Sequence, residues 1–349
     1  MTLSRVSLVS SCCAFLLLVL LAREANQAIP VPVLENQDIY YSYLEGKRLR
    51  DGKNPYARVL EGDMLQNDKY ATYFPVFYEL SYVSQNLGLH NYYDWIAFWQ
   101  GVFVLFEFGI ALLLFLALAR RNLEWLGILA AAFWLFNRWT LKVVEMSNLD
   151  FIPIFLVVLS LLLFPRRKWL SLLLFSLSLG FKQIAIFVAP LYLVWIWRST
   201  SGRQRWKELA LAGVLVVSVP LVSALPFLVW NAEGFVKSIL FSATRLASNQ
   251  FDIPSLDQIM GWQGLSARLV MLGLMAAAYF AVFKGLGKKY FAALLVMSIF
   301  LDYNSVLYSQ YPAWLVPLVP LVFLDFMPPA TPTATVPENS QPGISGEHT

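Results

Sequence analysis

Long apolar runs recur along this chain from Leu8 to Phe326, and they constrain its fold more than any other feature. A helix needs roughly 20 apolar residues to cross a hydrocarbon core of about 30 Å. Hydrophobic residues make up 58% of the 349 residues and charged residues only 14%, whereas soluble domains are about half apolar and a quarter charged. The runs are continuous and do not alternate as β-barrel strands do. The pattern predicts an all-α, polytopic membrane bundle.

We expect about ten transmembrane segments, one pair of them short or re-entrant, in a single domain over residues 1–327. They cover residues 6–22, 95–119, 123–143, 149–164, 169–181, 183–197, 208–230, 265–283, 290–307 and 311–326. Two long polar stretches, 23–94 and 231–264, lie between them, and the Pro/Ser/Thr-rich tail 328–349 is expected to be disordered. The first segment is expected to remain as an uncleaved helix, with a signal peptide as the alternative.

Lysine and arginine cluster in the short loops, at 120–121, 166–168, 198–207 and 284–289. Such loops stay on the cytoplasmic side of membrane proteins. All four clusters share that side only if residues 169–197 turn back as a hairpin of two short helices, with Gly180 as the break and Lys182 at the turn. Helices this short occur where protein or a wet cavity surrounds them. Both termini are then cytoplasmic, and the polar stretches 23–94 and 231–264 lie outside.

The first polar stretch contains two predicted interfacial segments. Residues 38–50 predict an amphipathic helix that lies in the plane of the membrane surface. Its two faces are an apolar-aromatic one with Tyr40, Tyr41, Tyr43, Leu44 and Leu49, and a polar one with Glu45, Lys47, Arg48 and Arg50. The sequence DGKNPY ends this helix, with Gly52 as the cap and Pro55 as the stop. Residues 72–88 predict the second interfacial segment.

Ionisable residues collect near the outer ends of the segments, where such groups usually line a functional cavity. Asp38 is either a general base or the N-cap of the helix it opens. Lys182 is either a phosphate ligand or a lysine whose long side chain carries its charge to the interface. Asp150 either contacts a sugar or caps the next helix. Arg245 either clamps a phosphate or is solvated.

The sequence contains no Walker motif, no GxGxxG, no HExxH and no GxSxG, so nucleotide chemistry is not predicted. His90 and His348 are far apart, and Cys12 and Cys13 are adjacent inside the first apolar segment. We therefore predict no metal site and no cofactor. The net charge of +4 is small and its distribution indicates membrane topology, so no nucleic-acid partner is predicted. An enzyme of this kind would receive its activated substrate through the membrane.

Several short motifs follow one another along the chain. They are the early Asp38, the turn GKNPY, the segment YFPVFYEL, the stretch NLDFIPIF and the hairpin LGFKQIAIFVAP. Their order and spacing resemble the GT-C superfamily of integral-membrane glycosyltransferases, and more narrowly the bacterial polyprenyl-phosphate-mannose-dependent mannosyltransferases. Val76 stands where that family has a second proline in its Y-x-P-P-like segment.

The resemblance implies a GT-C fold and a hexosyltransferase. Its donor would be a polyprenyl-phosphate sugar, with mannose as the family default, and its acceptor a hydroxyl of a glycan or glycolipid, with inversion at the anomeric carbon. The resemblance also implies Asp38 as the catalytic base, Asn148 and Asp150 at the sugar, and Lys182 at the donor phosphate.

Position adds further candidates to this site. Arg245 is assigned to the donor phosphate, and Tyr73, Gln310 and Tyr311 are assigned to the sugar or acceptor. The expected location is the plasma (inner) membrane, with the active site on the outer or periplasmic side and a role in the cell envelope. A lipid-linked sugar transporter or flippase, and a non-catalytic envelope-assembly protein, are the alternatives.

Overall fold

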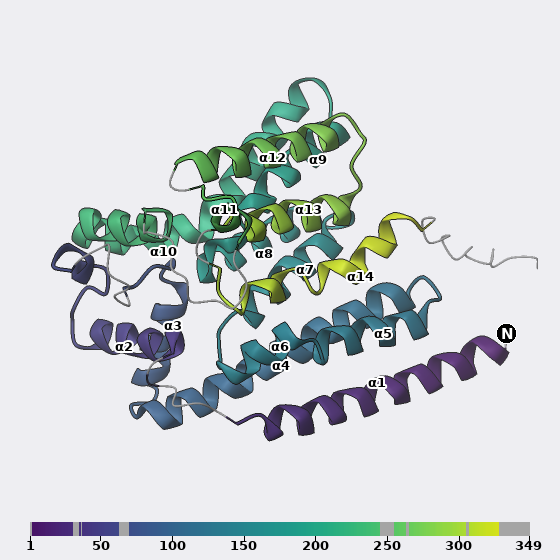
Figure 1. Cartoon of the computed structure of the whole chain (residues 1–349), viewed down its shortest axis with the longest axis horizontal. Helices are drawn as coiled ribbons and strands as arrows, with labels where there is room; N and C mark the ends of the chain where they lie inside the picture. The colour runs from purple at the N-terminus through teal and green to yellow at the C-terminus, as the bar shows by residue number, and fades with distance from the viewer. Residues whose placement is uncertain are drawn as a thin grey trace, which may run out of the picture.

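The computed structural model describes residues 2–30, 35, 37–62, 70–244, 255–262, 265–304 and 307–327. This described part is helical, contains no strand, and forms an elongated bundle (Figure 1). Three of its helices are long and apolar enough to cross a membrane: α1 (Thr2–Ala28), α4 (Tyr92–Ala119) and α10 (Gly202–Thr244). The predicted all-α membrane bundle is confirmed.

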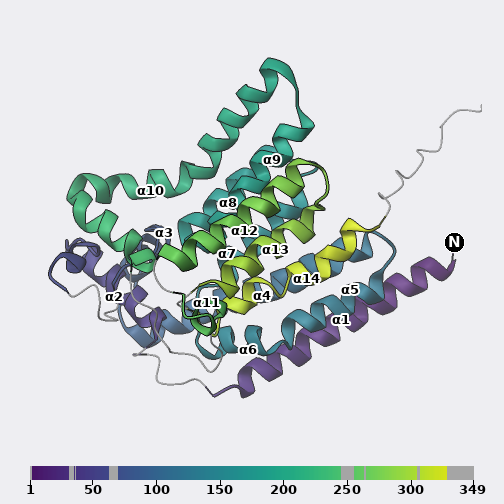
Figure 2. The same ribbon diagram turned by 45° about the horizontal axis from the view of Figure 1, so that its top comes forward.

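The helices end at two opposite sides of the molecule. Helices α2 (Asp38–Arg50) and α3 (Val76–Asn86) lie at the end opposite to the N-terminus in both views (Figures 1 and 2). The turn from α4 to α5 (Glu124–Leu135) and the turn from α12 (Leu265–Phe283) to α13 (Lys289–Asp302) lie at the N-terminal end. Two of the basic loops therefore share one side with the N-terminus. That this side is cytoplasmic stays a prediction.

The predicted break at Lys182 is confirmed. Helix α7 (Phe151–Leu163) is followed by α8 (Lys168–Phe181), which ends at Lys182 in an extended conformation with φ −157° and ψ 123°. The chain continues through the short helix η3 (Gln183–Val188) into α9 (Ala189–Ser199). Tyr192 of α9 packs on Phe175 of α8 with ring centroids 4.9 Å apart, so the chain folds back beside α8 as a hairpin.

Two predicted single segments are broken in the structure. Segment 123–143 divides into α5 and α6 (Arg138–Glu145), because Asn137 accepts a 2.9 Å hydrogen bond from the Trp139 N–H and starts a new helix. Segment 311–326 forms η4 (Tyr311–Trp314), α14 (Leu318–Val322) and η5 (Phe323–Asp325). Prolines at positions 312, 317 and 320 remove the N–H groups that one continuous helix needs.

The expectation of an outer loop from residue 231 is corrected in its first part. Helix α10 continues to Thr244 after a break at Asn231, whose φ is −159° and ψ is 88°. The Asn231 Oδ1 accepts a 2.9 Å hydrogen bond from the Gly234 N–H and so starts the second helical part. This part packs on the first polar stretch beside η2 (Ala57–Leu60), where the Phe235 and Tyr56 ring centroids are 4.8 Å apart. A short α11 (Leu256–Ile259) follows. The predicted disordered tail lies outside the described residues.

Helix α2 has the predicted bounds, and Gly52 follows it in the left-handed region at φ +69°. Its buried face agrees with the predicted apolar face only in part, since Tyr43 is buried as expected but Glu45 and Gly46 are buried too. Glu45, assigned to the polar face, is 1% exposed and lies among the buried residues of α2, a helix that packs against α3. The Gln85 side chain of α3, for example, donates a 2.9 Å hydrogen bond to the Tyr43 carbonyl of α2.

Gly46 allows this close contact between α2 and α3. A Cβ at position 46 would collide with the Ser81 side chain and would lie 2.9 Å from Gln85 Nε2. We expect Gly46→Val to destabilise the protein by about 1–3 kcal/mol, the usual cost of overpacking. Thermal unfolding of the purified protein in detergent measures the effect. Gly213→Val in α10 is the matched control, since its Cβ would meet nothing within 4 Å, and equal melting of both variants would contradict the packing argument.

Candidate functional site

A buried ion pair lies at the end of the bundle that carries α2 and α3. Lys182 Nζ is 2.8 Å from both carboxylate oxygens of Asp150, and both side chains are 0% exposed. The Trp314 indole N–H donates a further 2.7 Å hydrogen bond to Asp150 Oδ1. Asp150 stands at the N-cap position of α7 but makes no capping hydrogen bond. Its carboxylate instead joins α7, the α8–η3 break and η4.

Two aromatic rings flank the Lys182 ammonium. Its nitrogen lies 5.1 Å from the ring centroid of Tyr73 and 5.6 Å from that of Tyr311. Such distances allow cation–π attraction on both rings. The structure therefore brings together four of the predicted site residues, from four separate stretches of the chain.

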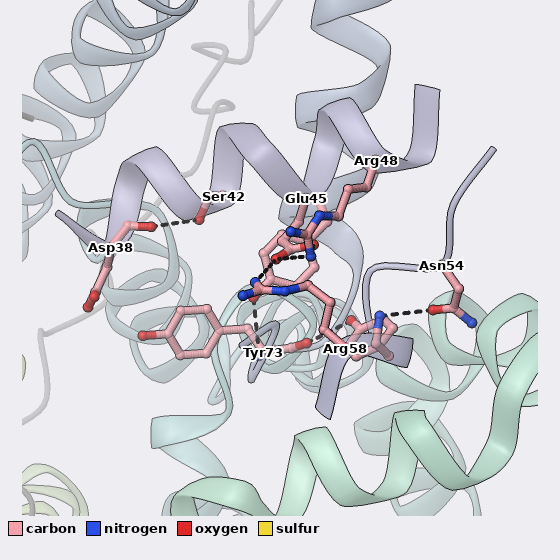
Figure 3. Close-up of polar contacts among 9 residues, drawn as sticks. Asp38, Ser42, Glu45, Arg48, Asn54, Arg58 and Tyr73 are labelled. Atoms are coloured by element: carbon pink, nitrogen blue, oxygen red, sulfur yellow. Dashed lines mark hydrogen bonds and ion pairs between the residues drawn. The ribbon is translucent and has the colours of Figure 1, made fainter. Parts of the chain in front are cut away.

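The backbone of Tyr73 is held by two other tyrosines. The Tyr56 hydroxyl donates a 2.8 Å hydrogen bond to the Tyr73 carbonyl, and the Tyr73 N–H lies 3.4 Å from the Tyr78 hydroxyl. Tyr56 is 0% exposed, and its own N–H bonds to Asn54 Oδ1 at 2.9 Å (Figure 3). Asn-Pro-Tyr was predicted as a helix stop and as part of the motif order that carries the resemblance, and Tyr56 is a supporting residue for which no role was predicted.

Asp38 is half-buried in the first turn of α2, where Gln37 occupies the N-cap position. Its carboxylate and the Tyr73 hydroxyl extend toward the same side in Figure 3. Burial, and then the negative charges of Asp38 and Asp150, raise the pKa of Tyr73 well above its usual value. Tyr73 therefore lies within the electrostatic reach of both carboxylates and stays protonated.

Glu45 is a second supporting residue, although its place on the polar face of α2 predicted only a solvated side chain. Its buried carboxylate accepts hydrogen bonds from Arg48 at 3.3 Å and from Arg58 at 3.5 Å (Figure 3). Burial raises the pKa of Glu45, and the two arginines oppose this shift. Through Arg58 the carboxylate connects α2 to η2 and so fixes the loop that carries Tyr56.

Two further residues predicted to contact the sugar or acceptor are buried, and each is close in sequence to a residue of the site. Asn148 is 3% exposed, two residues before Asp150. Gln310 directly precedes Tyr311 and is 0% exposed, and its Nε2 and Oε1 atoms have no hydrogen-bond partner in the described part of the chain. Arg245 lies outside the described residues, and its assignment stays a prediction.

Residues 150–246 match the model of the ALG6, ALG8 glycosyltransferase family. The match begins at Asp150 and includes Lys182, so both partners of the buried ion pair lie inside it. It confirms the resemblance to GT-C membrane glycosyltransferases. The narrower resemblance to bacterial mannosyltransferases is not supported by it, and no curated protein matches the chain. Together with the three helices long enough to cross a membrane, the match supports an integral-membrane glycosyltransferase.

The buried ion pair allows a prediction about the folding stability of its variants. Asp150→Asn leaves the Lys182 ammonium without its counter-charge inside the protein, which costs about 3–5 kcal/mol. The double variant Asp150→Asn/Lys182→Met removes both charges and is expected to recover most of that loss. Thermal unfolding of the two single variants and the double variant gives the coupling energy. Additive losses in the double variant would show that the pair does not stabilise the fold.

Proposed function

We propose that this chain transfers a hexose from a polyprenyl-phosphate donor to an acceptor hydroxyl at the outer face of the membrane, with inversion. The observation that carries the proposal is the placement of Asp38 with Tyr73, which in turn flanks the buried Asp150–Lys182 pair. The matched family supports sugar transfer without naming mannose. Mannose and glucose donors are therefore both to be assayed.

The two carboxylates of the site suit different tasks. Asp150 already accepts two contacts from Lys182 and one hydrogen bond from Trp314, so protonating it would break a buried ion pair. Asp38 is half-buried at the start of α2 and can be reached from outside. We assign Asp38 as the general base and Asp150 as the group that holds Lys182 in place.

Lys182 is assigned to the donor phosphate. An ammonium has three N–H donors, and two of them point to Asp150. The third is proposed to meet a phosphate oxygen when the donor binds, and Arg245 is proposed as a second cation. Positive charge there would stabilise the charge that develops on the leaving phosphate.

The proposed reaction is one displacement. The acceptor oxygen attacks the anomeric carbon, its proton passes to Asp38, and the bond from the anomeric carbon to the phosphate oxygen breaks. Polyprenyl phosphate leaves with the electron pair of that bond. Because the attack comes from the face opposite to the leaving group, the anomeric configuration inverts.

Sugar and acceptor contacts are assigned to Asn148, Asp150, Tyr73, Gln310 and Tyr311. Gln310 has the strongest support, because a buried amide without partners is costly and a sugar hydroxyl can both donate to and accept from it. We further propose that the protein lies in the plasma membrane, and that the α2–α3 end faces the periplasm or exterior.

Asp38→Asn tests the proposal. The amide keeps the shape of the side chain but cannot take up the acceptor proton, so we expect transfer to fall by at least about 10²-fold, the usual lower range for a lost acid–base group. Transfer is measured in membranes supplied with polyprenyl-phosphate mannose or glucose, and expression and thermal unfolding are measured in parallel.

Asp51→Asn is the matched control, at the opposite end of α2 with a side chain 45% exposed. It is expected to keep full activity. A transporter or an assembly protein would be indifferent to Asp38→Asn. Unchanged transport or assembly in cells, with no sugar transfer by the unaltered protein, would favour one of those alternatives.

A further inference from the structure

A cavity of about 480 Å³ opens between the C-terminal end of α1 and helices α4, α6 and α7. Its walls are mostly apolar, with Phe103, Val104, Phe108, Val144 and Phe151 among the lining side chains. None of the proposed catalytic groups lines it. The volume lies in the range of small-molecule pockets.

Polar groups of α1 line the same cavity. Arg23, Asn26 and Gln27 come from the last two turns of α1, at the end of the helix from which the chain leads to α2. Arg23 is exposed and makes no ion pair within the described ranges, and the neighbouring Glu24 does not line the cavity. A hydrocarbon-lined space with a cation at one end of a spanning helix matches the chemistry of a lipid with an anionic head group.

Beside the cavity, the contact between α1 and the bundle leaves some polar atoms without a hydrogen-bond partner. Asn26 donates a 2.8 Å hydrogen bond to Glu107 of α4, but Asn26 Oδ1 and Glu107 Oε1 have no partner in the part of the chain that the structure describes. Leu16, Leu17, Leu20 and Leu21 of α1 are all more than half exposed. These exposed leucines suit contact with the bilayer. Phospholipid is the most abundant molecule there.

We propose that this cavity is a binding site for an anionic phospholipid, with one acyl chain between α1 and α4 and the phosphate at Arg23. The bound lipid joins the outer end of α1 to α4 and to the α6–α7 loop. Ser147 of that loop lines the cavity and accepts a 2.7 Å hydrogen bond from Gln100. The lipid thus supports the loop that carries Asn148 and Asp150 without touching the ion pair.

Gly101 gives a clean way to fill the site. It lines the cavity, and a Cβ at this position would meet no atom within 4 Å. Gly101→Leu therefore occupies the space without forcing the helices apart. Gly213→Leu in α10 is the matched control, because its Cβ also meets nothing and it lies away from the cavity.

The test is photolabelling of the purified full-length chain in nanodiscs of phosphatidylcholine. The tracer is phosphatidylglycerol or phosphatidylcholine with a diazirine in one acyl chain, and mass spectrometry locates the label. We expect phosphatidylglycerol to label peptides 100–108 and 143–151 about fivefold more than phosphatidylcholine, the preference that one basic residue gives. Gly101→Leu should abolish this labelling, Gly213→Leu should keep it, and Arg23→Gln should remove only the preference for the anionic lipid.

Three results would overturn the proposal: equal labelling by both tracers in the unaltered protein, labelling that survives Gly101→Leu, or stronger displacement of the label by polyprenyl phosphate than by phosphatidylglycerol. The last result would make the cavity a substrate site. The readout needs no sugar transfer, so it stands or fails separately from the proposed glycosyltransferase activity. If Gly101→Leu does not fold, the comparison of tracers on Arg23→Gln still decides the outcome.

Discussion

The structure depends on one buried pair of opposite charges. Removing a carboxylate and an ammonium from water is expensive, and only close contact and further hydrogen bonds compensate for it. Asp150 and Lys182 meet this condition through two 2.8 Å contacts and the 2.7 Å hydrogen bond from Trp314. Each partner comes from a different part of the chain. Helix α8 must therefore end at Lys182, α7 must begin after Asp150, and η4 must pack against both.

The first polar stretch builds a second layer over this pair. Tyr73 meets Lys182 through its ring, while its backbone is held by Tyr56 and Tyr78. Tyr56 is itself enclosed by the rings of Phe227 and Phe235 from α10. The position of one aromatic ring is thus set by residues from both halves of the chain. Helix α3 begins shortly after Tyr73 and packs against α2. The same contacts therefore also place Asp38, the first residue of α2.

Local signals allowed much of this arrangement to be predicted from the sequence. The bounds of α2 follow from its apolar pattern and from Gly52, and the break at Lys182 follows from placing all basic loops on one side. Four proposed site residues, Tyr73, Asp150, Lys182 and Tyr311, do lie together. Their individual roles are proposals.

Features that depend on distant partners were not predictable. Glu45 looks like a solvated residue in the helical pattern, and only α3 and Arg58 show why it is buried. Asn137 interrupts a run whose composition is otherwise that of a spanning helix, and α10 extends past Asn231 because the first polar stretch offers Tyr56 as a packing partner. At Glu45 and in α10 a tertiary contact outweighed the local pattern, whereas at Asn137 a local cap on the Trp139 N–H interrupted the apolar run.

Helix length explains why the polar cluster can exist within such an apolar chain. With 13 residues in α7 and 14 in α8, each helix is only about 20 Å long, against a hydrocarbon core of about 30 Å. Neither helix can cross alone, so the space at their ends must be filled by other groups. Trp314 and the ion pair fill it with polar atoms that satisfy one another, and the Tyr73 ring flanks the ammonium. A lipid-borne sugar can reach such a depth from the head-group layer without leaving the bilayer, whereas a soluble nucleotide sugar would have to enter it from water.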